Sequence, residues 1–137
     1  MQRGVRVEQV REAVRLAKSR GIQAGMFLMW GYEGEEPQDV EATVEHVKAC
    51  RPDVFLTTVS YPIKGTGYYE QVRDRLVTVE EWRNSTDRDF SIRGRHGRDY
   101  FKFADQLLRR SMDASADPRE IEAARAGLHA SYAEVEA

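Results

Sequence analysis

The stretch Ala24-Gly-Met-Phe-Leu-Met-Trp-Gly-Tyr-Glu-Gly-Glu-Glu-Pro37 decides the fold of this chain. Its apolar run, residues 26–30, predicts a strand that is covered on both faces, as in a parallel sheet. Gly31 and Gly34 then allow a sharp turn and a close approach between backbone and ligand. Pro37 suits the first turn of a helix. A strand, a glycine loop and a helix form the unit of β/α enzymes, whose chemistry lies at the carboxyl ends of the strands, although a structural turn without a ligand has the same pattern.

Periodic apolar residues predict further elements on both sides of this stretch. The apolar spacing predicts strands at 23–30 and 54–60, a short helix at 66–76, and longer helices at 6–20, 37–49, 99–112 and 117–135. Thr78 followed by Glu81 matches a capping box and favours a short helix at 77–82, whereas the polar residues 84–98 predict a loop. Two strands joined by a helix predict a parallel βαβ unit. Because two strands alone make a marginal sheet, we expect this unit to belong to a larger β/α architecture.

Composition limits the classes of protein to which the chain can belong. It has 137 residues, 41% of them hydrophobic and 32% charged, which is typical of one soluble domain. The net charge of −2 argues against a general nucleic-acid binder. The sequence has no apolar run of about 20 residues and no signal-peptide core near Met1, so we expect a cytoplasmic protein. The single cysteine, Cys50, excludes an internal disulfide and a cluster held by several cysteines of this chain alone.

Short motifs follow one another along the first half of the chain: Gln2-Arg3-Gly4, Gly21-Ile22, Gly31-Tyr-Glu-Gly34-Glu35, Tyr61-Pro62 and Gly65-Thr66. Their order resembles the second half of the radical S-adenosylmethionine (radical SAM) barrel. The most similar branch is the cobalamin-associated one, with magnesium-protoporphyrin ester cyclases and radical methyltransferases. There the later strands commonly end in Gly-Leu-Pro-Gly-Glu-Thr and Tyr-Pro-x-x-Gly-Thr. This sequence keeps both glycines and Glu35 but has Glu33 and Glu36 in place of the proline and the threonine.

The resemblance implies an α/β fold: residues 1–76 as the later part of a TIM-like (β/α) barrel, and residues 77–137 as a helical extension. Enzymes of this family cleave S-adenosylmethionine reductively, for radical redox or methyl-transfer chemistry, with a 4Fe-4S cluster and in some cases cobalamin. The family's Cys-x-x-x-Cys-x-x-Cys loop is absent from this sequence. We therefore expect a C-terminal fragment that is inactive alone. Its partners would be a missing N-terminal half, from the same gene or a separate chain, and a small-molecule substrate, without nucleic acid or membrane.

The resemblance also places cofactor contacts at the strand ends, on Met29, Trp30, Gly31, Gly34, Glu35, Thr57 and Ser60, with Tyr61 facing cofactor or substrate. The residues themselves suggest further substrate contacts: Gly65-Thr66, as a helix start that can bind a carboxylate or phosphate, and Arg95, in a cationic loop that can cover an acidic substrate. No residue receives a catalytic or metal-binding role. Simpler roles stay open: Met29 and Trp30 as core residues, Gly65-Thr66 as a turn and helix cap, and Arg95 with Arg93, His96 and Arg98 as a solvated loop.

Two other functions also stay open at this point. The chain can be a non-enzymatic accessory module that docks on a partner carrying the cluster half. It can also be an unrelated small α/β domain that binds an anion at its glycine loops.

Overall fold

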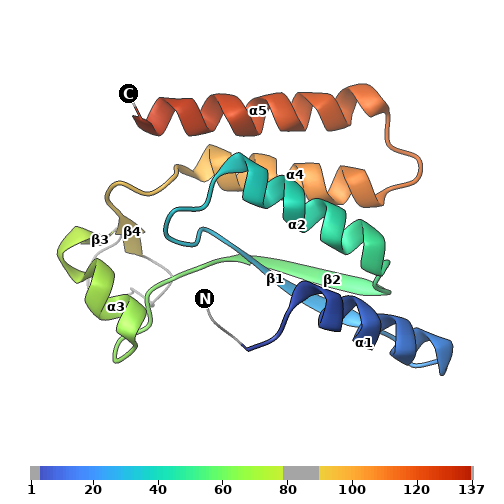
Figure 1. The fold of residues 1–137 in the computed structure, drawn as a ribbon. Helices are drawn as coiled ribbons and strands as arrows, with labels where there is room; N and C mark the ends of the chain where they lie inside the picture. The colour runs from blue at the N-terminus through green and yellow to red at the C-terminus, as the bar shows by residue number, and fades with distance from the viewer. Residues whose placement is uncertain (1–3, 79–89, 137) are drawn as a thin grey trace.

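The computed structural model describes residues 4–78 and 90–136 of the chain (Figure 1). The fold is mixed α/β. In chain order the elements are α1 (Val7–Ser19), β1 (Gly25–Trp30), α2 (Pro37–Cys50), β2 (Val54–Val59), α3 (Gly67–Val72), the 3-10 turn η1 (Arg73–Arg75), β3 (Leu76–Thr78), β4 (Phe90–Ile92), α4 (Arg98–Met112) and α5 (Pro118–Glu136). None of the helices in these two ranges is long and apolar enough to cross a membrane.

The centre of the fold is a parallel pair, β1 beside β2, as the sequence predicts. The register runs from Gly25 opposite Val54 to Trp30 opposite Val59. Residues that face each other across a parallel pair point to the same side of the sheet, and alternate residues point to opposite sides. The side chains of this pair therefore form two sets, one on each face.

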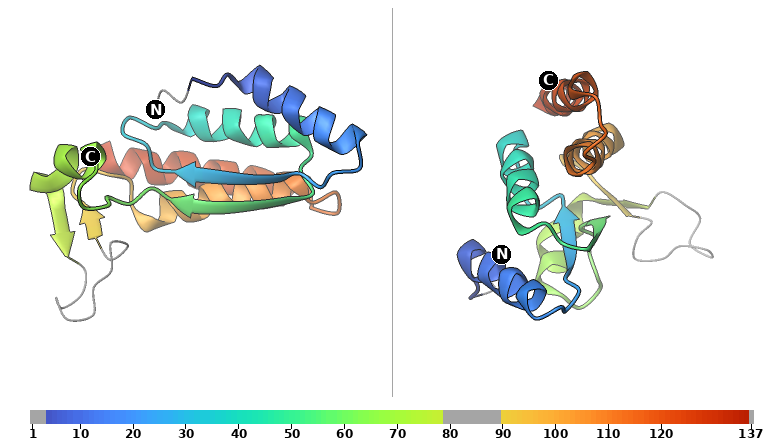
Figure 2. Two further views of the ribbon diagram at one scale, coloured as in Figure 1. Left: turned by 90° about the horizontal axis from the view of Figure 1, so that it is seen from below. Right: turned by 90° about the vertical axis from the view of Figure 1, so that its right-hand side faces the viewer.

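Helices cover one face of this pair. Leu28 and Trp30 of β1 pack with the valines of α2 and with Leu107 and Leu108 of α4, and α5 packs on the far side of α4. Figure 2 (left) shows β1 and β2 in front, with α4 and α5 behind them. The predicted helices at 37–49, 99–112 and 117–135 are confirmed, and they make the main hydrophobic core on this side.

The opposite face is bare, so the prediction of a strand covered on both faces is wrong. Phe27 of β1 is 67% exposed, and its register partner Leu56 of β2 is 58% exposed. Val54, at the start of β2, is also exposed. The physical reason is that no element of the described chain packs against this side. A continuous apolar run shows that both faces avoid water, but it does not show what covers them.

A small antiparallel hairpin corrects the prediction for the middle of the chain. Leu76 pairs with Ile92 and Thr78 with Phe90, so β3 and β4 occupy parts of the predicted 77–82 helix and 84–98 loop. Residues 79–82 and 84–89 of those two predictions lie outside the described part of the chain. Strands of three residues are too short to show an alternating pattern, which explains why the sequence did not predict them.

Candidate functional site

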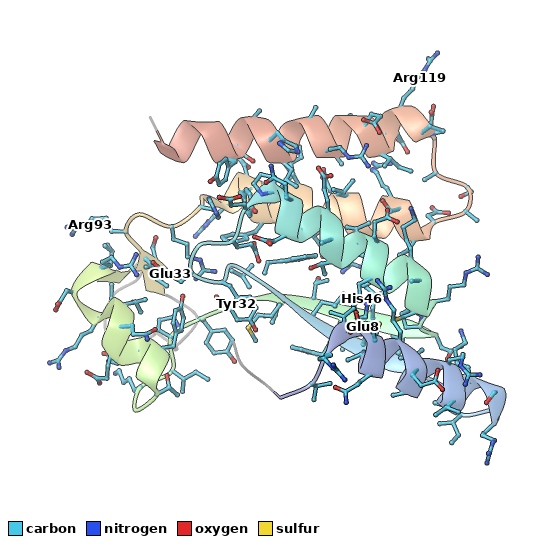
Figure 3. All side chains as sticks on the ribbon, viewed as in Figure 1. Glu8, Tyr32, Glu33, His46, Arg93 and Arg119 are labelled. Carbon is cyan, nitrogen blue, oxygen red and sulfur yellow. The ribbon has the colours of Figure 1, made fainter. Side chains whose placement is uncertain are left out.

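A cavity of about 170 Å³ lies at the carboxyl end of β1. Its lining comes from three distant parts of the chain: residues 31–36 after β1, residues 94–96 after β4, and Tyr132 near the end of α5. Figure 3 shows Tyr32 and Glu33 at this end of the molecule and Glu8 and His46 at the other end. The cavity thus lies where a parallel β/α fold usually places its ligands.

The backbone of Gly31 is fixed by hydrogen bonds on both sides. Its N–H donates to both carboxylate oxygens of Glu35, at 3.1 and 3.0 Å, and its carbonyl accepts from the Ser60 hydroxyl at 2.6 Å. The Ser60 N–H donates to the Trp30 carbonyl at 2.8 Å. These bonds tie the ends of β1 and β2 together, because Ser60 directly follows β2. Gly31 has φ of +84°, a conformation that favours glycine.

Glu35 is a buried carboxylate, 8% exposed, below the cavity. Burial raises its pKa above the usual range, while the hydrogen bonds from the N–H groups of Gly31 and Tyr32 oppose this rise. The phenol of Tyr100 lies close to the same carboxylate, and burial, with that negative charge, raises the pKa of Tyr100 strongly. Glu35 therefore acts in the structure as an acceptor that shapes the loop.

The guanidinium of Arg95 lies over the ends of both strands. Its Nη1 donates to the Ser60 carbonyl at 2.6 Å, and its Cζ lies 4.9 Å from the centre of the Phe101 ring. A Cβ atom at position 31 would collide with Nη2 of Arg95 and would lie 3.0 Å from the Phe101 ring, so a larger residue there would have to push the guanidinium aside. Burial lowers the pKa of Arg95, although nearby tyrosine and glutamate side chains oppose that shift.

His96 closes the side of the cavity. Its Nε2 lies 2.7 Å from the Glu35 carbonyl oxygen, which can only accept, so Nε2 carries the hydrogen. The ring stacks on Tyr100 at 4.0 Å between centroids and lies 5.2 Å from the ring of Tyr132. Nδ1 is buried and has no hydrogen-bond partner among the described residues. The ring is therefore held in one orientation by stacking and by one hydrogen bond.

The structure brings together only some of the residues that the sequence proposes for the site. Gly31, Gly34, Glu35 and Arg95 line the cavity, and Ser60 lies directly beneath them. The remaining residues lie elsewhere: Met29 on the bare face, Trp30 in the core at 2% exposure, Thr57 on the helix side with its hydroxyl bonded to Asp105, and Tyr61, Gly65 and Thr66 outside the cavity lining.

Thr66 has the simpler role that the sequence left open. Its hydroxyl accepts from the Tyr69 N–H at 3.3 Å and donates to the Ile63 carbonyl at 2.7 Å, so it caps α3. Gly65 beside it is exposed, with open space where a Cβ would lie. In the structure, this pair forms a turn and a helix cap.

Tyr132 and Tyr100 are site residues that sequence reasoning missed. Tyr100 belongs to the apolar stripe of α4, and Tyr132 lies near the end of α5, a hundred residues after Tyr32. Neither position has a local sequence signal, because their role comes from the stacking of His96 against α4 and α5. The sequence gives one general hint for these two residues: a buried tyrosine usually places its hydroxyl at the edge of the core, where it can meet a polar partner.

The iron–sulfur cluster of the resembling family does not fit the residues present. Cys50 ends α2 and packs with Val14 and Ala24 at the amino end of β1, away from the cavity. Burial raises the pKa of its thiol, and its Sγ lies 3.8 Å from Nδ1 of His46. Within residues 4–78 and 90–136, no group of three or more His, Cys, Asp or Glu side chains could hold a metal ion. We therefore assign this chain no step that runs through a cluster.

The chain is similar over part of its length to a protein named as a methyltransferase. A protein of Pyrococcus horikoshii, described as the uncharacterized methyltransferase PH0819, is 30% identical over 96 residues, which is 69% of this chain. The chain spans only 21% of the length of that relative. No protein-family model matches the sequence. The similarity is thus to a small part of a larger methyltransferase-like protein.

Proposed function

We propose that this chain forms the later part of a radical SAM barrel and supplies the strand ends that contact the adenosine of S-adenosylmethionine. In this proposal the cluster is held by residues outside these 137, and the complete enzyme transfers a methyl group or carries out a related radical reaction. The observation that carries the proposal is the one-sided covering of β1 and β2, combined with the fixed Gly31 loop at their carboxyl ends.

The one-sided covering has the geometry of a barrel wall. In a (β/α) barrel the helices pack on the outside, and alternate strand residues point to the interior. Phe27 and Met29 of β1, with Leu56 and Thr58 of β2, occupy the interior set by their register. Phe27 and Leu56 are more than half exposed, so the apolar interior of such a barrel would have to be completed by further strands. The similarity to part of a larger methyltransferase is consistent with this arrangement.

The cavity is smaller than a complete ligand site. Sites for small molecules usually have volumes of about 300–1,000 Å³, whereas this cavity has about 170 Å³. The proposal therefore gives this chain one wall of the site: the Gly31 peptide and the carboxyl ends of β1 and β2. Cobalamin stays part of the proposal only through the family branch, since no contact of the described residues bears on it.

The same surfaces would serve an accessory module. The bare face of Phe27 and Leu56 would suit a cluster-bearing partner on a separate chain as well as on the same chain. The outer edges of β1 and β2, which pair with no other strand in the described part of the chain, would suit it equally. The two versions share the adenosine contact and differ only in covalent connection. A cluster-bearing segment encoded in frame with this chain would favour the first version, and one encoded by a separate gene would favour the second.

A binding experiment tests the adenosine contact directly. Saturation-transfer NMR with methylthioadenosine should show transfer from the 137-residue chain to the adenine protons. Gly31→Ala should abolish the transfer because its Cβ displaces Arg95 from the strand ends. Gly65→Ala is the matched control, since Gly65 has nearly the same φ but open space around it. Absence of transfer from the folded wild-type chain, or equal loss in both variants, would contradict the proposed contact.

A further inference from the structure

Arg95 has two donors that the protein leaves without acceptors. Its Nη1 bonds to the Ser60 carbonyl, but Nε and Nη2 are buried and have no hydrogen-bond partner among the described residues. The phenol of Tyr68 lies near the guanidinium and opposes the fall in the pKa of Arg95 by its charge and by hydrogen bonding, but it leaves Nε and Nη2 without a bond of good geometry. An unsatisfied buried donor is destabilising, and more so when it is charged. Nε and Nη2 form one edge of the planar guanidinium, so the two unsatisfied N–H groups point the same way and can bond to one ligand group.

The carboxylates around the cavity do not neutralise this charge. Glu35 accepts from the Gly31 N–H, and Glu33 forms a two-oxygen pair with Arg75, at 3.0 Å to each oxygen. Glu36 is exposed to solvent. Among the side chains that the structure describes, those of residues 4–77 and 91–132, no carboxylate lies at ion-pair distance from Arg95. The charges of Glu33 and Glu35 act on Arg95 from nearby, but neither carboxylate bonds to it, and a partly buried cation with unsatisfied donors favours the binding of an anion.

We propose that the cavity beside Arg95 binds the carboxylate of a ligand, with the two oxygens on Nε and Nη2 of Arg95. These donors match the two oxygens of a carboxylate in a planar, two-bond arrangement. The inference rests on the proposed function in placing the ligand in the same cavity, and it adds the ligand's chemical class. The carboxylate belongs either to the amino-acid end of S-adenosylmethionine or to a separate substrate.

The surroundings favour a carboxylate over a phosphate. Glu33, Glu35 and Glu36 all line the cavity, so a dianion would meet more repulsion than a monoanion. The Phe101 ring supports one face of the guanidinium and keeps its plane defined. Nε and Nη2 are buried, with Nη2 over Gly31, so the proposal requires the guanidinium to turn toward the cavity when the carboxylate binds. One hydrogen bond, to Ser60, holds it in the ligand-free position.

NMR of the 137-residue chain tests the carboxylate site without requiring adenosine to bind. The Nε–H signal of Arg95, assigned by its disappearance in Arg95→Lys, is followed during titration with sodium acetate at constant ionic strength. We expect a saturable shift with a Kd on the order of 10 mM, since one small anion in an open cavity binds weakly. Phosphate should shift the signal less than acetate. No acetate shift, or a tighter response to phosphate, would overturn the proposal.

Two variants distinguish binding by the two-donor edge of the Arg95 guanidinium from binding by its positive charge alone. Arg95→Lys keeps the charge but loses the two-donor edge, so acetate affinity, measured on the Gly31 and Gly94 amides, should fall about tenfold. Arg93→Lys is the matched control: Arg93 lies two residues away, its side chain is exposed, and it is outside the cavity lining (Figure 3). Equal weakening in both variants would overturn the assignment to Arg95. If Arg95→Lys does not fold, the Nε–H signal is assigned instead through the side-chain carbons of Arg95 in the isotope-labelled wild type, and its titration with acetate decides the question.

A second pair of titrations identifies the source of the carboxylate. S-adenosylmethionine carries a carboxylate, and methylthioadenosine has the same adenosine without one. If Arg95 binds the cofactor's carboxylate, S-adenosylmethionine binds about tenfold more tightly than methylthioadenosine, and Arg95→Lys removes the difference. Equal binding of the two, with acetate still shifting Arg95, assigns the site to a substrate. Acetate binding without any adenosine binding would contradict the proposed function and leave the carboxylate site standing.

Discussion

The loops that follow β1 and β2 have equivalent positions in the sheet but different surroundings. Both follow a strand of the same parallel pair, both lie at its carboxyl end, and each contains a glycine of nearly equal φ, +84° at Gly31 and +85° at Gly65. A Cβ at Gly31 would meet Arg95 and Phe101, whereas a Cβ at Gly65 would meet nothing within 4 Å. The first loop lines a cavity, and the second starts an exposed helical turn, α3.

The difference shows that a strand-end glycine loop becomes a site only when other parts of the chain close over it. The loop at Gly31 is covered by Arg95 and His96 from the β4–α4 turn and by Tyr132 from α5. In the second loop, Ser60 bonds to Gly31 and Arg95, but Gly65 has open space where a Cβ would lie, and the Thr66 hydroxyl bonds to the nearby Ile63 carbonyl. We therefore place the proposed ligand at the first loop and predict that substitutions there have the larger effects.

The largest effect is expected from alanine at the two glycines. Gly31→Ala forces a side chain into a positive φ and also displaces Arg95, so we expect about 3 kcal/mol of lost stability. Gly65→Ala has the same backbone strain in open space, and we expect about 1 kcal/mol. Urea denaturation followed by circular dichroism measures both. Equal losses would show that the covering of Gly31 contributes nothing beyond backbone strain.

The local part of this comparison can be predicted from the sequence, and the rest cannot. The apolar run before Gly31, the Pro37 helix start and the β-branched residues before Tyr61 predict both strands and the helix between them. The cover of the first loop cannot be predicted, because Arg95 lies 64 residues after Gly31 and Tyr132 lies farther still. Sequence patterns describe which residues avoid water, while the partners of a loop are decided by tertiary packing.

The two faces of β1 also show that the sequence pattern does not reveal which residues are covered. Leu28 and Phe27 are neighbours in one apolar run, yet Leu28 is 8% exposed in the core and Phe27 is 67% exposed. Nothing in the run distinguishes them, because the strands of parallel sheets are commonly apolar on both faces. Thr57 was expected to face a ligand, but its register partner is Leu28 and it therefore faces α4. The register of the two strands decides which face of the sheet each side chain points to, and the register is known only once the strands are paired.

Ser60→Ala tests the connection between the two strand ends. The variant removes the hydroxyl that donates to the Gly31 carbonyl, and we expect about 1–2 kcal/mol of destabilisation because the acceptor is buried. Ser19→Ala is the control, since its hydroxyl makes a similar bond to Leu16 at an exposed helix end. Its cost should be below about 0.5 kcal/mol. A loss at Ser60 no larger than at Ser19 would mean that the strand ends are not coupled through this bond.

Glu35→Gln should change how stability depends on pH. Burial raises the pKa of Glu35 in the folded chain above the 4.5 of the free group, so the folded state binds this proton more tightly than the unfolded state. The free energy of unfolding of the wild type should therefore decrease as pH rises from 4.5 through the raised pKa, relative to the glutamine variant. Unfolding in urea at several pH values measures the difference, and Glu36→Gln at the exposed neighbour is the control. A wild type that gains stability over this range relative to Glu35→Gln would contradict the assignment.

The smallest effect is expected at the second loop. Thr66→Ala removes the cap of α3, a six-residue helix, and we expect about 0.5 kcal/mol, at the low end for an N-cap. Hydrogen exchange should become faster for the amides of α3, including Tyr69, while the amides of β1 and β2 keep their wild-type rates. We expect the effect to stay local because Gly65 and Thr66 are exposed and the cap joins Thr66 to its neighbours Ile63 and Tyr69. If Thr66→Ala instead accelerates exchange at Gly31 or Trp30, the two loops are coupled, and the second loop belongs to the site that the first one forms.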